Sequence, residues 1–230
     1  GGGFGRRIIN DFAAEAMAIS KRAAVPVKLT WTRTDDIHND FFRAGGFENM
    51  RGAITKEGKL AALDQQYIGF TKDGSPVMGS GLDGNEFTIA ALTQSHVTQA
   101  TIDMSTPCGP WRAPGSNTNA FVEQSFLNEL SHLAERDYAE FLIELMGERR
   151  WLSENANSLN TGRAIDTINL VTEKSAWGQS LPAGKGVGLA FYFCHAGHVA
   201  EVAEVTVNSD KTFHVDRVTV AIDVGPIINI

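Results

Sequence analysis

Two pairs of extended segments, each joined by a short polar turn, constrain the fold of this chain most. The first pair lies between residues 47 and 70, on either side of the turn Lys56–Lys59. The second pair covers residues 199–207 and 213–223 and is joined by Asn208–Lys211. Short turns of this composition connect antiparallel strands, whereas parallel strands need long crossovers. The sequence therefore predicts β-hairpins and argues against a doubly wound parallel sheet.

Helical periodicity occupies much of the remaining sequence. Ile8, Phe12, Ala16 and Ile19 are spaced by four, four and three residues, which predicts an amphipathic helix ending before Pro26. Further helices are predicted over 122–133, after Asp137 and over 165–171, strands over 27–31 and 188–193, and a surface loop over 71–84. This mixture predicts an α+β fold of mixed sheets and hairpins with packed helices.

Length and charge limit the classes of function. A chain of 230 residues fits one large or two small domains, and the polar stretch from Ser153 to Asn160 predicts a boundary between residues 1–152 and 153–230. The 20 Lys and Arg against 27 Asp and Glu give a net charge of -7, which argues against nucleic-acid binding. The longest apolar runs fall short of the ~20 residues that a membrane-spanning helix needs.

Two loops are candidate anion sites. Four glycines and Phe4 occupy the first five positions, directly before the first predicted helix, and Trp111–Asn117 leads into another helix. Backbone N–H groups at such positions, and Arg112 in the second loop, attract phosphate groups. A glycine turn that only packs, and a surface arginine in an ordinary turn, are the alternatives. Arg6 stands where a Rossmann fingerprint needs glycine or alanine, and no Walker motif follows.

The cysteines and histidines do not form a recognisable metal motif. Cys108 and Cys194 are the two cysteines, too few for a disulfide scaffold or a Cys-rich cluster. His195 and His198 follow Cys194 without a second Cys or His pair nearby, so no metal site is predicted there. The Asp35–Asp40 segment reads as a solvated loop, and no Gly-x-Ser-x-Gly motif supports hydrolase chemistry.

The ordered blocks of the chain resemble a specific family. The blocks are Gly1–Arg7, Pro26–Arg33, Asp35–His38, Asp40–Arg43, Arg112–Gly115, residues 121–132, Ala176–Trp177, Gly186–Ala190, Val199–Val205 and Asp223–Gly225 with Asn229. They resemble the molybdenum hydroxylases, the family of xanthine dehydrogenase and aldehyde oxidase, and most of all the large subunit of isoquinoline 1-oxidoreductase. The resemblance runs from the first residue to the last.

The resemblance implies an oxidoreductase that hydroxylates an N-heterocycle or aldehyde carbon with oxygen derived from water. The cofactor would be molybdenum-molybdopterin in its cytosine dinucleotide form, with no protein ligand to the metal. Residues 1–152 would be part of a first molybdopterin-binding domain that lacks its start, and 153–230 part of a second that lacks its end. A non-catalytic, cofactor-less binding or assembly module of the same fold is the alternative.

The resemblance also assigns site residues. Cofactor contacts would come from Gly2, Gly3, Phe4, Gly5, Arg6, Arg112, Ala113, Pro114 and Gly115, and substrate contacts from Phe41 and Arg43. The family's catalytic glutamate would lie beyond Ile230, because Glu123, Glu129, Glu201 and Glu204 sit in helix or strand patterns. The chain is therefore expected to be a fragment without a catalytic residue of its own.

Partners follow from the same resemblance. Iron-sulfur clusters would sit on a 2Fe–2S small subunit, not on this chain, and a cytochrome c is one electron acceptor that the resemblance allows. The substrate would be a small molecule. The family is bacterial in this branch, and both a periplasmic and a cytoplasmic location remain open.

Overall fold

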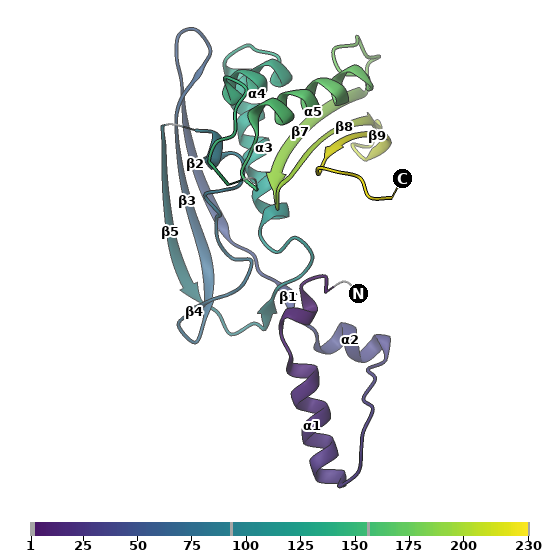
Figure 1. Cartoon of the computed structure of the whole chain (residues 1–230). Helices are drawn as coiled ribbons and strands as arrows, with labels where there is room; N and C mark the ends of the chain where they lie inside the picture. The colour runs from purple at the N-terminus through teal and green to yellow at the C-terminus, as the bar shows by residue number, and fades with distance from the viewer. Residues whose placement is uncertain (1–2, 93, 156, 230) are drawn as a thin grey trace. The chain divides into compact units, whose positions relative to one another are not determined.

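The computed structural model describes residues 3–92, 94–155 and 157–229 and has the α+β architecture that the sequence predicts (Figure 1). The helices are α1 (Asp11–Ala23), α2 (Arg33–Asn39), α3 (Ser116–Leu133), α4 (Tyr138–Met146) and α5 (Thr161–Glu173), with short 3-10 turns η1 (Arg6–Ile8) and η2 (Ile89–Ala91). The strands are β1 (Phe42–Arg43), β2 (Phe47–Ile54), β3 (Leu60–Lys72), β4 (Ser75–Pro76), β5 (Ser95–Asp103), β6 (Cys108–Gly109), β7 (Lys185–Cys194), β8 (Gly197–Val207) and β9 (Phe213–Asp223).

The chain divides into two compact units. Unit 1 comprises Gly1–Phe47, Tyr67–Leu82 and Gln99–Asn117, and unit 2 comprises Glu48–Gln66, Asp83–Thr98 and Thr118–Ile230. Each unit is assembled from segments that are distant in sequence. The predicted division at residue 152 into a first and a second cofactor domain stays a prediction.

The first predicted hairpin forms between β2 and β3. The Thr55 N–H donates to the Lys59 carbonyl at 2.8 Å, and Gly58 takes a φ of 77° in the turn, a conformation that suits glycine. The sheet continues from β3 to β4, and β5 also pairs with β3. Residues 71–84, predicted as a loop, begin with the tight β3–β4 turn and then run without regular structure.

The second predicted hairpin belongs to a three-stranded antiparallel sheet in the order β7-β8-β9. Helix α5 lies across this sheet, as Figure 1 shows. Asn160 caps α5 by accepting a hydrogen bond from the Arg163 N–H at 3.0 Å. The predicted strands 188–193, 199–207 and 213–223 and the predicted helix at 165–171 are thus all present.

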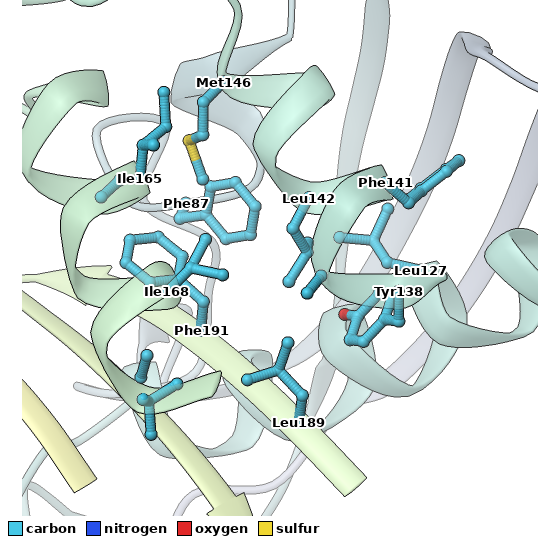
Figure 2. Close-up of a cluster of buried hydrophobic side chains, with 14 of the residues drawn as sticks. Phe87, Leu127, Tyr138, Phe141, Leu142, Met146, Ile165, Ile168, Leu189 and Phe191 are labelled. Carbon is cyan, nitrogen blue, oxygen red and sulfur yellow. The ribbon is translucent and has the colours of Figure 1, made fainter. Parts of the chain in front are cut away.

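The hydrophobic core of unit 2 lies where α4, α5 and the end of α3 meet the sheet (Figure 2). Phe87 and Phe191 are fully buried there, with ring centroids 5.2 Å apart in an edge-to-face arrangement. Leu142 and Ile168 are also fully buried. Burial of such side chains contributes about 1.5–3 kcal/mol each, so this cluster dominates the stability of unit 2.

One predicted strand is wrong. Residues 27–31 form no strand in the described structure, because strand formation requires a hydrogen-bonded neighbour and none lies beside them. The Trp31 indole instead donates to Glu15 of α1 at 3.0 Å. The segment after it, predicted as a loop, is α2, which starts with a capping box between Thr32 and Asp35.

No helix in the described parts of the chain is both long enough and apolar enough to cross a membrane.

Candidate functional site

The two predicted anion loops lie against each other within unit 1. The Arg112 N–H donates to the Phe4 carbonyl at 2.9 Å. Phe4 and Gly5 both adopt positive φ, 51° and 84°, and a Cβ on Gly5 would lie 2.6 Å from the Pro110 carbonyl oxygen. Glycine is therefore required at position 5 for the close approach of the two loops. Gly2, predicted to contact a cofactor, lies outside the described residues.

Arg43 holds the second loop in place. Its guanidinium donates to the carbonyls of Arg112 at 2.8 Å, Ala113 at 3.0 Å and Pro114 at 3.3 Å, and to Asn117 Oδ1 at 3.1 Å. It also lies over the Trp111 ring, 5.1 Å from its centroid. The hydrogen bonds from the Arg43 guanidinium therefore fix the conformation of the 112–115 turn, including the positive φ of Ala113.

A short parallel strand pair sets the position of Arg43. Phe42 of β1 pairs with Cys108 of β6, and Arg43 pairs with Gly109. A Cβ on Gly109 would lie 2.6 Å from the Phe41 ring, so the ring packs closely over the backbone of β6. The segment that carries Phe41 and Arg43 is therefore fixed directly beside the second loop.

These segments enclose a cavity of about 750 Å³, here named the glycine-loop cavity. Its walls are Gly3, Phe4, Arg6, Arg7, Arg33, Asp36, Ile37, Asp40, Phe41, Phe42, Arg43, Pro110 and Trp111. Five of the predicted site residues line it directly: Gly3, Phe4, Arg6, Phe41 and Arg43. Residues 112–115 do not line it and join it through Arg43 and the Phe4 carbonyl. A cavity of this size suits a small-molecule ligand.

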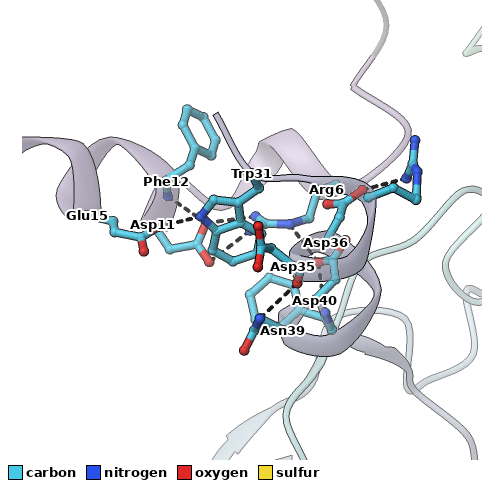
Figure 3. A network of polar contacts seen from close by, with 11 residues as sticks. Arg6, Asp11, Phe12, Glu15, Trp31, Asp35, Asp36, Asn39 and Asp40 are labelled. Atoms are coloured by element: carbon cyan, nitrogen blue, oxygen red, sulfur yellow. Dashed lines mark hydrogen bonds and ion pairs between the residues drawn. The ribbon is translucent and has the colours of Figure 1, made fainter. Parts of the chain in front are cut away.

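Arg6 is the centre of a polar network in the cavity wall (Figure 3). It donates to both carboxylate oxygens of Asp11, at 2.7 and 3.1 Å, and its Nε is 2.6 Å from Asp40 Oδ1. Its guanidinium lies 4.9 Å from the centroid of the Phe41 ring. The hydrogen bond between Arg6 and Asp11 raises the pKa of Arg6 and lowers that of Asp11. Two carboxylates therefore neutralise Arg6, which acts as a brace between the glycine loop, α1 and the segment before β1.

Two other arginines differ from Arg6 in their surroundings. Arg7, in the cavity wall, and Arg112, in the second loop, are exposed, and neither side chain forms an ion pair within the described residues. Arg33, by contrast, pairs with Asp36 at 2.6 Å. Arg7 and Arg112 are therefore the cations of the two loops that are available to an anionic ligand.

The four glutamates considered as catalytic candidates in the sequence analysis do not line the glycine-loop cavity. Glu123 is 1% exposed in unit 2, where it accepts hydrogen bonds from the Thr88 N–H at 2.7 Å and Gln65 Nε2 at 3.4 Å. Burial raises the pKa of Glu123 to about 8. Glu129 and Glu201 are exposed, and Glu204 is half-buried on β8. The prediction that the catalytic glutamate lies beyond Ile230 stays a prediction.

The region around Cys194 brings together side chains that are distant in sequence. His198 is fully buried, its Nε2 accepts from the Asn160 N–H at 3.2 Å, and burial lowers its pKa. Cys194 and His195 instead converge with Glu86, with one potential ligand atom of each within 4.8 Å of the others. Glu86 carries no local sequence signal that links it to Cys194, so sequence reasoning missed it.

Solved structures share this fold. The aldehyde oxidoreductase of Desulfovibrio desulfuricans matches 94% of the chain with a TM-score of 0.61 at 16% identity, over 25% of its own length. Quinoline 2-oxidoreductase from Pseudomonas putida 86 matches 90% of the chain with a TM-score of 0.57 at 17% identity, over 28% of its own length. At these identities the likeness establishes the fold.

Sequence relatives point in the same direction. The isoquinoline 1-oxidoreductase subunit beta of Brevundimonas diminuta is 28% identical over 98% of the chain and 29% of its own length. A membrane-bound aldehyde dehydrogenase (pyrroloquinoline-quinone) of Gluconacetobacter polyoxogenes is 29% identical over 83% of the chain and 27% of its own length. The chain thus spans less than a third of the length of these curated relatives.

A family model settles the assignment. The model of the molybdopterin cofactor-binding domain matches residues 1–143, which include both predicted anion loops and the whole glycine-loop cavity. The chain belongs to the molybdopterin cofactor-binding domain family of the molybdenum hydroxylases, as its ordered sequence blocks predict.

Proposed function

We propose that this chain forms part of the cofactor-binding portion of an oxidoreductase that hydroxylates an aldehyde or N-heterocycle carbon with oxygen derived from water. The single observation that carries the proposal is the meeting of two anion loops at one cavity, where the Arg112 N–H binds the Phe4 carbonyl. The names of the relatives supply the two substrate classes, aldehydes and fused N-heterocycles.

The residues of the loops fit a pyrophosphate-bearing pterin cofactor. The backbone N–H groups of Phe4, Gly5 and Arg6 have no acceptor within the described part of the chain, and Arg7 and Arg112 supply positive charge. On Gly3, a Cβ would meet no atom closer than Arg7 Cβ, at 3.8 Å, so open space adjoins the backbone there. Free donors, cations and an open approach are the features that a phosphate group requires.

Each segment would have a defined task. Gly3, Phe4 and Gly5 would lie against the cofactor, while Arg6 would hold that loop through Asp11 and Asp40. Arg112 would face its phosphates, with Ala113, Pro114 and Gly115 as the rigid support. When bound, the molybdenum–pterin group would supply the two-electron redox chemistry of the hydroxylation.

Phe41 and Arg43 would form the substrate side of the cavity. The Phe41 ring lines the cavity and is held by Arg6 and the backbone of Gly109, so it would supply an apolar contact to the substrate. Arg43 would act mainly by position, because four of its hydrogen bonds already go to the second loop. The proposal includes the cytosine dinucleotide form of the cofactor and a separate 2Fe–2S subunit that receives the electrons.

The substitution Gly3→Val tests the proposal. The side chain of valine has room within the chain itself, so folding should be unchanged, but it would fill the space that a cofactor needs. Gly188→Val is the matched control, since Gly188 lies on β7 in unit 2 with no atom within 4 Å of an added Cβ. Both variants of the full-length protein would be expressed in a host that makes the cofactor.

The measurements are molybdenum content, released cytosine nucleotide and the co-purified iron-sulfur subunit. We expect Gly3→Val to lose at least tenfold in molybdenum occupancy while Gly188→Val matches the parent protein. Equal occupancy in both variants would overturn the placement of the cofactor at the glycine loop. A parent protein that carries no molybdenum and oxidises neither isoquinoline nor aromatic aldehydes would instead support a cofactor-less assembly module.

A further inference from the structure

Three side chains of unit 2 bring an oxygen, a sulfur and a nitrogen ligand to one place. Glu86 precedes the buried Phe87, Cys194 ends β7, and His195 opens the β7–β8 turn. One ligand atom from each lies within 4.8 Å of the other two. None of these residues lines the glycine-loop cavity, so they have no part in the function proposed above.

The hairpin turn holds the imidazole beside the thiol. Cys194 pairs with Gly197 as the last pair of the β7–β8 ladder, which leaves His195 and Ala196 as a two-residue loop. Both have positive φ, 50° and 63°. Turns of this type favour Asn-Gly, because positive φ strains residues with a Cβ. A His-Ala sequence is therefore energetically unfavourable in this turn, and the turn places His195 next to Cys194.

One hydrogen bond holds the Glu86 carboxylate, and a second holds the backbone of the next residue. The Tyr192 hydroxyl donates to Glu86 Oε2 at 3.0 Å, and the Phe87 N–H donates to the Phe193 carbonyl at 3.2 Å. Both partners are on β7, the same strand that carries Cys194. A ligating carboxylate that is itself held by a hydroxyl is the usual arrangement around protein metal ions.

We propose that Glu86, Cys194 and His195 bind one divalent cation of the zinc class. A thiolate, an imidazole and a carboxylate are all ligands that Zn²⁺ accepts, and three protein ligands leave the fourth position to water. Ligand atoms around tetrahedral zinc are separated by about 3.3–3.8 Å, given metal–ligand bonds of about 2.0–2.3 Å. The 4.8 Å upper limit on the present separations exceeds this range by about 1 Å, and small side-chain rotations, of which the exposed His195 is the freest, would close the difference.

Sequence spacing alone does not predict this site, because Glu86 is distant in sequence from Cys194 and His195. Antiparallel pairing and the Phe87–Phe193 hydrogen bond bring Glu86 to them. His198, which the same sequence segment offers, is not a member: its Nε2 accepts the Asn160 N–H and its ring packs 4.8 Å from the Phe193 ring. The proposed site therefore uses His195 and not His198, in a segment for which the sequence analysis predicts no metal site.

Cobalt titration tests the proposal directly. The full-length protein, stripped of divalent metal and kept reduced, would be titrated with Co²⁺ and then with Zn²⁺ as competitor. We expect one Co²⁺ per chain with thiolate-to-cobalt charge-transfer absorption that Zn²⁺ removes. Cys194→Ser should abolish the absorption, and Glu86→Gln and His195→Ala should each weaken binding at least tenfold. Tyr192→Phe should weaken binding about 10–100-fold.

A cysteine and a histidine outside the proposed site provide the matched controls. Cys108→Ser removes the second cysteine of these 230 residues, and His214→Ala removes a histidine on β9, so neither should change the titration. In the Cys108→Ser background, Zn²⁺ should slow the reaction of Cys194 with a thiol reagent at least tenfold. The assignment of this site would be overturned if the protein bound no stoichiometric Co²⁺. It would also be overturned if Cys194→Ser or Glu86→Gln left Co²⁺ binding unchanged.

Discussion

Different interactions stabilise the interior of each of the two units. In unit 1, η1, α1 and α2 contribute no buried residue. The glycine loop is fixed by Arg6 and by the backbone hydrogen bond from Arg112, and Arg43 holds the second loop. In unit 2, α5 alone buries seven residues against the β7–β9 sheet and α4. Polar contacts that are partly exposed add little stability each, whereas apolar burial adds much.

This difference follows the function proposed for each part. A loop that binds a large anionic cofactor must leave backbone donors and cations unoccupied, so it cannot be stabilised by its own packing. A ligand that binds such a region stabilises it in turn. We therefore expect substitutions in unit 2 to change the stability of the fold, and substitutions around the glycine loop to change ligand retention.

The largest expected effect comes from the core of unit 2. Phe191→Ala removes a fully buried ring that packs edge-to-face on Phe87, which should lower the free energy of unfolding by about 3–5 kcal/mol. Chemical denaturation measures this change. Phe213→Ala is the control, because Phe213 on β9 is 71% exposed and should cost less than about 0.5 kcal/mol. Similar losses in both variants would contradict the location of the core.

A pH-dependent effect of similar origin is expected at Glu123. Burial raises its pKa from 4.5 to about 8, so the folded chain holds a proton that the unfolded chain releases. Its contribution to stability is therefore complete below about pH 4.5 and is lost as the pH rises through about 8. Burial also raises the pKa of Glu48, which shares Gln65 with Glu123, and this adds to the same trend.

Glu123→Gln tests that trend, because an amide keeps an acceptor for the Thr88 N–H without the charge. We expect parent and variant to unfold alike at about pH 5, and the variant to be more stable by up to about 4 kcal/mol at pH 8. Denaturation curves across this pH range provide the measurement, with the exposed Glu129→Gln as control. A parent protein whose stability increases from pH 5 to 8, relative to Glu123→Gln, would show that Glu123 is charged when folded.

Local patterns in the sequence predicted most of the fold. The hairpin turns at Lys56–Lys59 and Asn208–Lys211 and the helices around Phe126, Phe141 and Ile168 depend on neighbours a few residues apart, so periodicity reveals them. The strand β5 was missed because its sequence is mostly polar and its pairing with β3 is a long-range property. Helix α2 was missed although its Thr32–Asp35 capping box is visible in the sequence.

The candidate site divides in the same way. The loops around Gly5 and Arg112 could be recognised from glycine, proline and arginine in fixed order, and the family match confirms the family that this order implies. Their contact, the use of Arg43 as a brace and the neutralisation of Arg6 by Asp40 depend on three-dimensional neighbours. No local pattern contains that information.

In the glycine-loop region, Arg112→Ala should reduce cofactor affinity rather than stability. The side chain has no ion-pair partner among the described residues, so its loss should leave unfolding unchanged within about 0.5 kcal/mol. A lost charge-assisted hydrogen bond to phosphate should weaken cofactor binding by about 1.5–3 kcal/mol. Molybdenum retention during dialysis is the measurement, and Arg22→Ala on the exposed end of α1 is the control. Equal retention in the two variants would remove Arg112 from the site.

The smallest effect is expected where the glycine loop is held by surface charge. Asp11→Asn breaks the bidentate ion pair with Arg6, yet Asp11 is 43% exposed, so the free energy of unfolding should fall by less than about 1 kcal/mol. Arg6 lowers the pKa of Asp11, so this contribution is present above the pKa of the unfolded chain and is lost as the pH falls through the lower, folded value. Hydrogen exchange resolves the effect better than global denaturation: amides of η1 and the first turn of α1 should exchange faster in the variant at pH 7, while those of β7 and β8 should not change. Acidification should bring the protection factors of the parent protein in that segment to those of the variant, with both proteins compared at the same pH. A uniform change across both units would mean that Arg6 and Asp11 stabilise the whole fold rather than the loop, and the contrast between the two units would then fail.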